Sequence, residues 1–333
     1  CWFESGSMPY AQNHYPFDAA RKQYVEDNLP ADFIAEGLDQ TRGWFYTLHV
    51  LSTALFGRPA FKNVIVNGLI LAADGKKMSK RLKNYPDPAK VIDSYGADAL
   101  RAYLINSAVV RGEPMKFGKN AQDLTGECVK ETVRVAILPL WNAFNFLVTY
   151  ARADGWSPTR ADLSAQALDN PQDRWISSRV GGFVAELASE YETYELSNLV
   201  PAFLRVCDDL NNWYIRRGRR RYWRAKGAGS DLDKQQAYAT LLRAIVTISR
   251  AMAPVLPFLA ELLHQRLVVE TGLAGPGEDS VHLCGFPRAE DFARDLALEA
   301  EVELARAVVA LGLTLREREH IGARLLIAIA EVR

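Results

Sequence analysis

The pattern of apolar residues changes from strand-like to helical along the chain, and this change constrains the fold more than any other feature. Residues 32–36 form a short apolar stretch, and residues 64–71 are rich in β-branched side chains; both patterns are typical of strands. Between them, residues 42–56 repeat apolar side chains at helical spacing. Residues 73–76 then form a turn. Because strand, helix and strand follow one another in this order, the first part of the chain is predicted to be a parallel α/β unit.

The rest of the chain has a different character. Residues 84–120 are interrupted by proline and glycine, which predicts a connector with short helices. Residues 121–290 carry long amphipathic patterns with few strand signals, which predicts an all-α helical bundle. Residues 291–333 begin with one more helical pattern, over 291–315, and lead into a junction region. We therefore expect an α/β part at 1–83, a connector, a helical domain and the start of a fourth region.

Composition and charge exclude several classes of protein. The chain has 333 residues, of which 49% are hydrophobic and 24% charged, so its composition is that of an ordinary globular protein and not of a disordered chain. Its 40 basic residues balance its 40 acidic ones. A net charge of zero excludes a polycation, although it leaves room for a local basic patch.

The cysteines and the two ends of the sequence bear on location and completeness. No two of the four cysteines form a Cys-x-x-Cys pair, so we expect no zinc site, no disulfide framework and a cytoplasmic protein. The apolar runs are too short for a membrane span, and no signal peptide is present. The chain begins at Cys1 and ends in a strand-like apolar run at 324–333. We therefore expect it to be the interior of a longer protein.

The strongest chemical motif is the basic loop Lys77-Met78-Ser79-Lys80-Arg81, which follows the predicted strand and its glycine turn. Two lysines three residues apart in such a loop can place their ammonium groups on a polyphosphate. A bare Lys-x-x-Lys is usually only a solvated turn. The whole pentapeptide, with the strand before it and Asn84-Tyr-Pro-Asp-Pro88 after it, favours a phosphate-binding role.

This pentapeptide resembles the KMSKS signature of class I aminoacyl-tRNA synthetases, with Arg81 at the position of the last serine. The wider context is similar to the isoleucyl members of that family. Four segments support the resemblance in the family's order, and together they span more than 200 residues. They are Trp2-Phe-Glu-Ser-Gly-Ser7, Glu36-Gly-Leu-Asp-Gln-Thr-Arg-Gly-Trp-Phe45, the KMSKR loop and Asn212-Trp-Tyr-Ile-Arg-Arg217.

The resemblance implies the fold and the reaction. The α/β part would be the second half of a Rossmann-like nucleotide-binding fold, and the helical bundle would be an anticodon-binding domain. The whole protein would use ATP, with Mg²⁺ bound to the substrate rather than to this chain, to activate isoleucine and transfer it to tRNA(Ile). It would act as a monomer. The segments 84–120 and 121–290 would then be a stem-contact-like connector and the anticodon-binding domain.

The resemblance also implies site residues. Lys77 and Lys80 would stabilise the departing pyrophosphate, and Trp2 and Trp44 would wall the isoleucine pocket. The ATP or adenylate would contact a larger set, namely Glu36, Gly37, Asp39, Gln40, Met78 and Ser79. The residue chemistry agrees, since a carboxylate can accept both ribose hydroxyls and glycine lets the backbone approach a ligand. Taken alone, however, Asp39 could be a helix N-cap, with Thr41 as the alternative cap, and a tryptophan is more often a core residue.

A second basic segment lies in the helical part. Residues 211–224 interleave six arginines with four aromatic residues, a composition that suits RNA phosphates and unstacked bases. The alternative is a helix with aromatic residues in the core and arginines in solvent or in ion pairs. The candidates for tRNA contact are Arg216, Arg217, Arg219, Arg220 and Arg221, and we expect some of them to bind carboxylates instead.

One signature of the family is missing from these residues. The His-x-Gly-His motif has no counterpart, because His320-Ile-Gly-Ala323 lacks the second histidine and follows the helical domain. We therefore expect this chain alone not to activate isoleucine. Three alternatives stay open: a valyl or leucyl relative, a non-catalytic tRNA-binding paralogue, and a helical interaction module, although the last leaves residues 1–85 unexplained.

Overall fold

The computed structural model describes residues 1–79, 81, 84–118, 126–164, 167–225 and 231–321. The chain divides into two compact units. One comprises Cys1–Leu138 with Leu187–Leu204 and Pro254–Leu259, and the other comprises Pro139–Glu186, Arg205–Ala253 and Ala260–Arg333. The predicted order of an α/β part followed by a helical part is confirmed.

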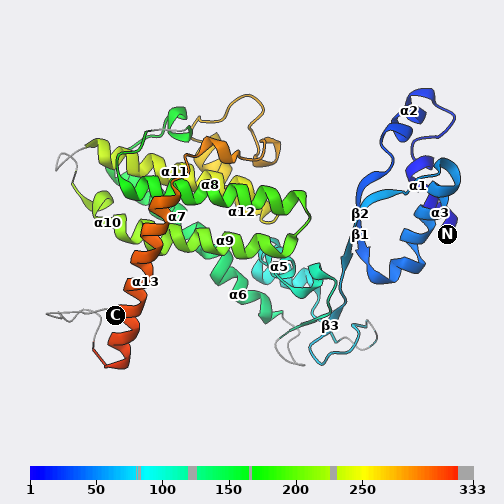
Figure 1. The fold of residues 1–333 in the computed structure, drawn as a ribbon, viewed down its shortest axis with the longest axis horizontal. Helices are drawn as coiled ribbons and strands as arrows, with labels where there is room; N and C mark the ends of the chain where they lie inside the picture. The colour runs from blue at the N-terminus through cyan, green and yellow to red at the C-terminus, as the bar shows by residue number, and fades with distance from the viewer. Residues whose placement is uncertain (80, 82–83, 119–125, 165–166, 226–230, 322–333) are drawn as a thin grey trace. The chain divides into compact units, whose positions relative to one another are not determined.

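The first unit begins with a strand–helix–strand motif. Strand β1 (Ala31–Gly37) pairs in parallel with β2 (Phe61–Asn67), and helix α3 (Trp44–Phe56) connects them. Helix α1 (Trp2–Ala11) lies beside α3, as Figure 1 shows. A Cβ atom on Gly6 would lie 2.9 Å from Thr47, so glycine at this position permits the close approach of the two helices. The local core contains Ile34, Phe45, Leu48 and Ala60.

The single strand predicted at 64–71 was wrong, because the structure has two strands there. Strand β2 ends at Asn67, and β3 (Ile70–Ala72) pairs in parallel with a different partner, β4 (Met115–Phe117). The break falls at Gly68, whose amide donates to the carbonyl of Val109 at 2.8 Å. A Cβ atom at Gly68 would lie 1.9 Å from the carbonyl oxygen of Glu113. The backbone of residues 109–113 therefore occupies the place of a neighbouring strand at this point.

The expected short helices of the connector are present. Helices α4 (Pro88–Tyr95) and α5 (Ala97–Ile105) follow the basic loop, whereas β4 was not predicted. Two further short α-helices lie among the described residues of 1–137, namely α2 (Ala19–Asp27) and α6 (Lys130–Thr132). The core beside the loop is formed by Val91, Ala99, Phe117 and Val129.

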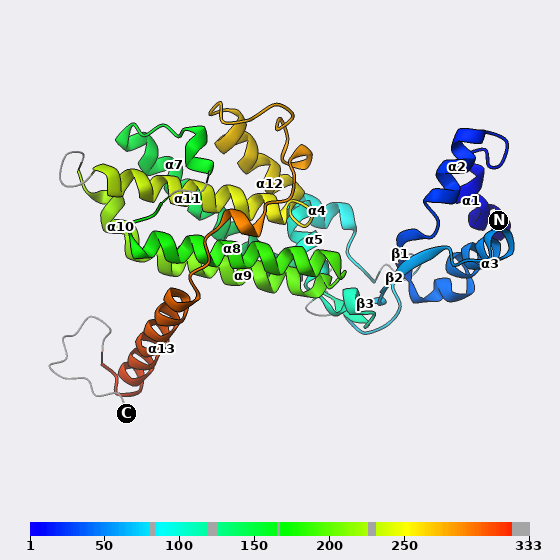
Figure 2. The same cartoon turned by 45° about the horizontal axis from the view of Figure 1, so that its top comes forward.

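The helical part is built from helices of eight to 23 residues. They are α7 (Leu138–Asp154), α8 (Pro171–Glu192), α9 (Leu199–Asp208), α10 (Arg216–Trp223), α11 (Asp231–Met252), α12 (Pro257–His264) and α13 (Leu296–Arg318). Helices α8 and α11 run side by side in both views (Figures 1 and 2). The last helix confirms the pattern predicted over 291–315, with Asp295 as its N-cap. The strand-like run at 324–333 lies outside the described residues.

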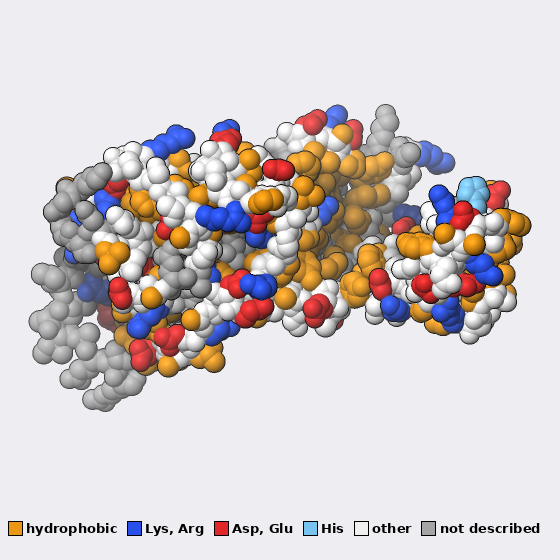
Figure 3. Space-filling model, turned by 90° about the horizontal axis from the view of Figure 1, so that it is seen from above, with side chains coloured by type: hydrophobic (Ala, Val, Ile, Leu, Met, Phe, Trp, Pro, Cys, Tyr) orange, Lys and Arg blue, Asp and Glu red, His pale blue; other side chains and the backbone are white. Residues whose placement is uncertain are grey.

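The stretch Glu127–Asp154 is long and apolar enough to cross a bilayer by length and composition. Only 28% of this apolar window is buried inside the protein, and the buried apolar side chains include Leu140, Ala143, Phe144 and Leu147. A core helix of a bundle has this same pattern. Acidic and basic side chains are interspersed on the face of the helical part shown in Figure 3, in keeping with the balanced composition.

Candidate functional site

The carboxyl end of β1 presents the predicted adenylate-binding segment. Strand β1 ends at Gly37, and a 3₁₀ turn (Leu38–Arg42) connects it to α3. The side chains of Glu36 and Asp39 are exposed at this edge. A Cβ atom on Gly37 would lie 2.8 Å from Asp39 Oδ1, so a larger residue at position 37 would displace that carboxylate.

The cap predicted for α3 was wrong. Neither Asp39 nor Thr41 caps the helix; instead the side-chain oxygen of Gln40 accepts a hydrogen bond from the amide of Trp44 at 2.8 Å. The hydroxyl of Thr41 donates to the carbonyl of Leu38. The helix begins at Trp44, after Gly43, so the cap is displaced by the 3₁₀ turn. Because Gln40 takes this role, the Asp39 carboxylate is not used to cap α3.

The structure brings the two predicted pocket tryptophans together around Gly43. Trp44 is half-buried against the Ile34 core, and its indole N–H donates to the carbonyl of Ser5 at 3.2 Å. Trp2 is 60% exposed, and a Cβ atom on Gly43 would lie 3.2 Å from its ring. Trp44 is therefore held in place by packing and a hydrogen bond, whereas most of the Trp2 side chain is exposed. The two residues are 42 positions apart in the printed sequence, and only the packing of α1 on α3 joins them.

The KMSKR loop is shaped by backbone and amide hydrogen bonds. Gly75, with φ of +82°, closes the turn in which the amide of Ala72 donates to the carbonyl of Lys76 at 2.9 Å. Further along, the side-chain oxygen of Asn84 accepts from the amide of Ser79 at 2.9 Å, and its amide group donates to the carbonyl of Lys77 at 3.3 Å. The side chain of Asn84 therefore links Lys77 and Ser79 to the end of the loop, and we call Asn84 the brace of the loop.

Of the two lysines of the loop, Lys77 lies within the described residues. Lys77 is exposed, and no described carboxylate lies within 4 Å of its ammonium group. Lys80 lies outside the described residues. Met78, for which an adenine contact is predicted, is half-buried and packs against the core that includes Val91 and Phe117. Its side chain therefore anchors the loop to the unit.

Sequence reasoning missed two residues of this region. Asn84 carried a usable signal, because an asparagine before Tyr-Pro is typical of a turn that its own side chain stabilises. Lys116 on β4 carried none, since it is remote in sequence. A Cβ atom on Gly75 would lie 3.3 Å from the Cε atom of Lys116, so this side chain lies against the loop's turn.

The basic segment of the helical part forms a π-helical turn (Asp209–Ile215) that continues into α10. Its aromatic residues are divided, since Tyr214 and Tyr222 are buried in the core whereas Trp223 is 57% exposed. Arg216, Arg219 and Arg220 are exposed, and no described carboxylate lies within 4 Å of any of them. Arg217 is also exposed, with its guanidinium 4.7 Å from the ring centroid of Trp213.

Arg221 is the member of this set that binds carboxylates. Its side chain is 12% exposed and makes two hydrogen bonds of 2.7 Å to Asp173, which is fully buried. It also pairs with Asp233 at 2.8 Å. Burial disfavours the charge on Arg221, but the hydrogen bonds to Asp173 dominate and raise its pKa above the ordinary value. Arg221 therefore has a structural role.

Within the described residues, no group of three or more His, Cys, Asp or Glu side chains could hold a metal ion. The four cysteines are free thiols. In the part of the chain that the structure describes, the candidate ligand-binding groups are thus exposed cations, carboxylates and rings.

Comparisons with known proteins match the first part of the chain and its helical part to two different families. Residues 1–116 match the family described as tRNA synthetases class I (I, L, M and V), and residues 173–331 match the anticodon-binding domain of tRNA ligase. An isoleucine–tRNA ligase of Protochlamydia amoebophila is 47% identical over 332 residues, which cover 100% of this chain and 30% of that protein. An isoleucine–tRNA ligase of Treponema denticola is 45% identical, covering 97% of this chain and 29% of that protein. The chain thus spans about three tenths of the length of these relatives.

Solved structures share the fold at lower identity. The LeuRS–tRNA–LeuAMS complex of Agrobacterium radiobacter K84 has a TM-score of 0.62 and 17% identity, over 89% of this chain and 33% of that one. The Mycobacterium tuberculosis methionyl-tRNA synthetase bound by methionyl-adenylate has a TM-score of 0.59 and 16% identity, over 77% of this chain and 50% of that one.

Proposed function

The chain belongs to the class I tRNA synthetases, and from this premise we propose that it is part of an isoleucine–tRNA ligase. It supplies the loop-bearing half of the catalytic domain and the anticodon-binding domain. The observation that carries the proposal is the braced KMSKR loop beside the β3–β4 pair, in a chain whose whole length aligns with relatives of that name.

The proposed reaction has two steps. The carboxylate of isoleucine attacks the α-phosphorus of ATP, the bond to the β-phosphate breaks, and isoleucyl-adenylate and pyrophosphate form. A ribose hydroxyl of tRNA(Ile) then attacks the activated carbonyl and releases AMP. Lys77 and Lys80 stabilise the charge that develops on pyrophosphate, because a positioned cation acts where that charge appears. Magnesium enters bound to ATP.

The edge of β1 holds the other substrate groups. Glu36 and Asp39, which are exposed, accept hydrogen bonds from the ribose hydroxyls of the adenylate, and Gly37 lets the backbone approach that ligand. The rings of Trp2 and Trp44 contact the branched side chain of isoleucine. A methylene in such a pocket is worth only about 1–3 kcal/mol of discrimination, a limit for which isoleucyl-tRNA synthetase is itself the standard example.

The helical part binds the phosphate backbone of tRNA(Ile). Arg216, Arg219 and Arg220 are exposed cations on α10, and Arg217 lies beside them. The complete enzyme works as a cytoplasmic monomer. Because the printed 333 residues contain no His-x-Gly-His motif, these residues by themselves do not form the adenylate.

A chimaera tests the catalytic part of this proposal. Residues 1–333 would replace the matching segment of the P. amoebophila relative, and ATP–pyrophosphate exchange would be measured with isoleucine, valine and leucine. We expect exchange that is fastest with isoleucine. Lys77→Ala should lower it by about two orders of magnitude, as the loss of one transition-state donor does. A preference for valine or leucine, or full activity of Lys77→Ala, would refute the assignment.

A further inference from the structure

The helical unit contains a cavity that the proposed function does not use. Its volume is about 320 Å³, at the lower end of the range for small-molecule sites. Helix α11 forms one wall, and the segments around residues 160–164 and 273–292 form the others. Four arginines but only two carboxylates line it, namely Arg160, Arg243, Arg250 and Arg288 with Glu278 and Asp291.

The two carboxylates are already engaged. Glu278 lies 3.3 Å from Arg160 and 3.9 Å from Arg250, and it also accepts a hydrogen bond from the amide of Gly275. Asp291 pairs at 2.8 Å with Arg288, an exposed side chain at the cavity's rim. The lining therefore carries an excess of positive charge.

Arg243 carries much of that excess. No described carboxylate lies within 4 Å of its guanidinium, which stacks on the ring of Phe292 at 4.0 Å and donates to the backbone carbonyl of Asp291. Burial lowers the pKa of Arg243 and outweighs the attraction of Asp291, which raises it, since a desolvated cation is unfavourable. A bound anion would remove this penalty.

Arg250 has a related deficit. Its Nε atom is buried and has no hydrogen-bond acceptor among the described residues. Its nearest carboxylate is the shared Glu278 at 3.9 Å, and its side chain is 23% exposed. The thiol of Cys284 also lies beside it, but a neutral thiol does not balance the charge.

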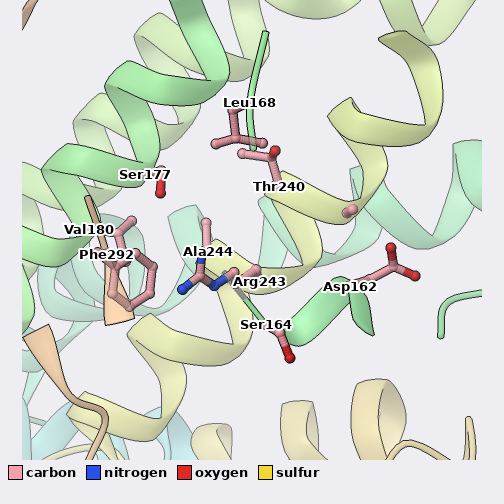
Figure 4. A pocket seen from close by; sticks show the side chains of 10 residues that line it. Asp162, Ser164, Leu168, Ser177, Val180, Thr240, Arg243, Ala244 and Phe292 are labelled. Carbon is pink, nitrogen blue, oxygen red and sulfur yellow. The ribbon is translucent and has the colours of Figure 1, made fainter. Parts of the chain in front are cut away.

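A second, much smaller cavity shares one wall with the first. Figure 4 shows Arg243 reaching from α11 toward Phe292, with Thr240 on the same helix. This smaller cavity has a volume of about 20 Å³, which is room for a single water molecule. The buried hydroxyl of Thr240 has no described partner and would bind that water. Only the larger cavity can take a ligand.

We propose that the larger cavity binds a small molecule with two adjacent phosphoryl groups, held by Arg243 and Arg250. These arginines are seven residues apart, so they share one face of α11 at a separation of about 10 Å along its axis. Thr247 lies between them on the same wall. A guanidinium matches phosphate oxygens with two parallel hydrogen bonds. The site uses none of the residues of the proposed function and does not depend on it.

Titration calorimetry with inorganic pyrophosphate tests this proposal on the full chain. The background variant carries Lys77→Gln and Lys80→Gln, so that the KMSKR loop does not contribute. We expect saturable binding to this variant. Adding Arg243→Gln with Arg250→Gln should weaken it at least about tenfold, because hydrogen bonds to charged groups are each worth more than one such step. The rim substitution Arg288→Gln should change it less than about twofold, since exposed pairs contribute little.

A second variant guards against misfolding. Thr247→Glu places a carboxylate between the two arginines and should exclude pyrophosphate; because Thr247 is buried, circular dichroism is used to establish that the variant is folded. No saturable binding to the background variant, or unchanged binding to Thr247→Glu, would overturn the proposal. Protection of Arg243 and Arg250 from phenylglyoxal by tRNA but not by pyrophosphate would also overturn it, and would make the cavity an RNA-phosphate site.

Discussion

The KMSKR loop and helix α10 are both basic, but they differ in whether one of their own cations helps to hold the segment in place. The loop is held by backbone turns, by Met78 and by the uncharged brace Asn84, and leaves Lys77 exposed. Helix α10 uses one of its own cations, Arg221, as a structural anchor, while its neighbour Arg220 stays exposed. The difference teaches that a basic motif does not identify its ligand-binding cations. In these two segments, the proposed ligand-binding cations whose side chains are described, Lys77 and Arg220 among them, are exposed.

The largest expected effect comes from removing the anchor of α10. Arg221→Gln leaves the buried carboxylate of Asp173 without its cation, and breaking such a pair typically destabilises a protein by about 3–5 kcal/mol. Urea unfolding would measure the loss. The matched control is Arg220→Gln, which should stay within about 0.5 kcal/mol of the parent. Equal stabilities for the two variants would abolish the distinction between these neighbours.

The next largest effect is expected at Gly68, where the stability of the region that precedes the loop depends on close backbone packing and not on charge. Gly68→Ala introduces a Cβ atom 1.9 Å from the carbonyl oxygen of Glu113, so the backbone must shift. We expect a loss of about 1–3 kcal/mol, the usual penalty for overpacking. Gly57→Ala is a poor control because φ there is +65°; Gly285→Ala is better, since a Cβ atom would meet nothing within 4 Å. Similar losses at positions 68 and 285 would contradict the packing argument.

A smaller effect is expected from the brace of the loop. Asn84→Ala removes the hydrogen bonds to Ser79 and Lys77 and should reduce stability by only about 1 kcal/mol. Hydrogen exchange at the Ser79 amide should nevertheless become faster, because that amide loses its acceptor. An unchanged exchange rate would show that Asn84 does not hold the loop.

The smallest effect is a pH dependence of the α10 anchor. Burial disfavours the charge on Asp233, but hydrogen bonds from Arg221 and Asn170 lower its pKa below the ordinary value. A lowered pKa gives stability that is complete above the unfolded value of about 3.9 and is lost as pH falls through the folded value. Thermal unfolding between pH 5 and pH 2, as a rough window, should show a shallower decline for Asp233→Asn than for the parent. Parallel curves would mean that this carboxylate does not contribute.

The sequence predicts the elements better than it predicts the contacts between them. The strand at 32–36, the helix over 42–56 and the final helix are confirmed because periodicity is a local property. The break at Gly68 and the pairing of β3 with β4 depend on a backbone more than 40 residues away, so no local pattern reveals them. The same holds for Arg221, whose partner Asp173 is 48 residues distant. The role of Gln40 as cap was hidden because Asp39 is the better cap by residue type.

The central claim is that the exposed arginines of α10, and not Arg221, contact tRNA. The direct measurement is the affinity of the chain for tRNA(Ile) as a function of salt, for the parent and for the triple variant Arg216→Gln, Arg219→Gln and Arg220→Gln. If each arginine contacts one phosphate, the triple variant should bind more weakly, and the slope of log K against log salt should be shallower by about two to three. Unchanged affinity and slope in a folded triple variant would contradict the account.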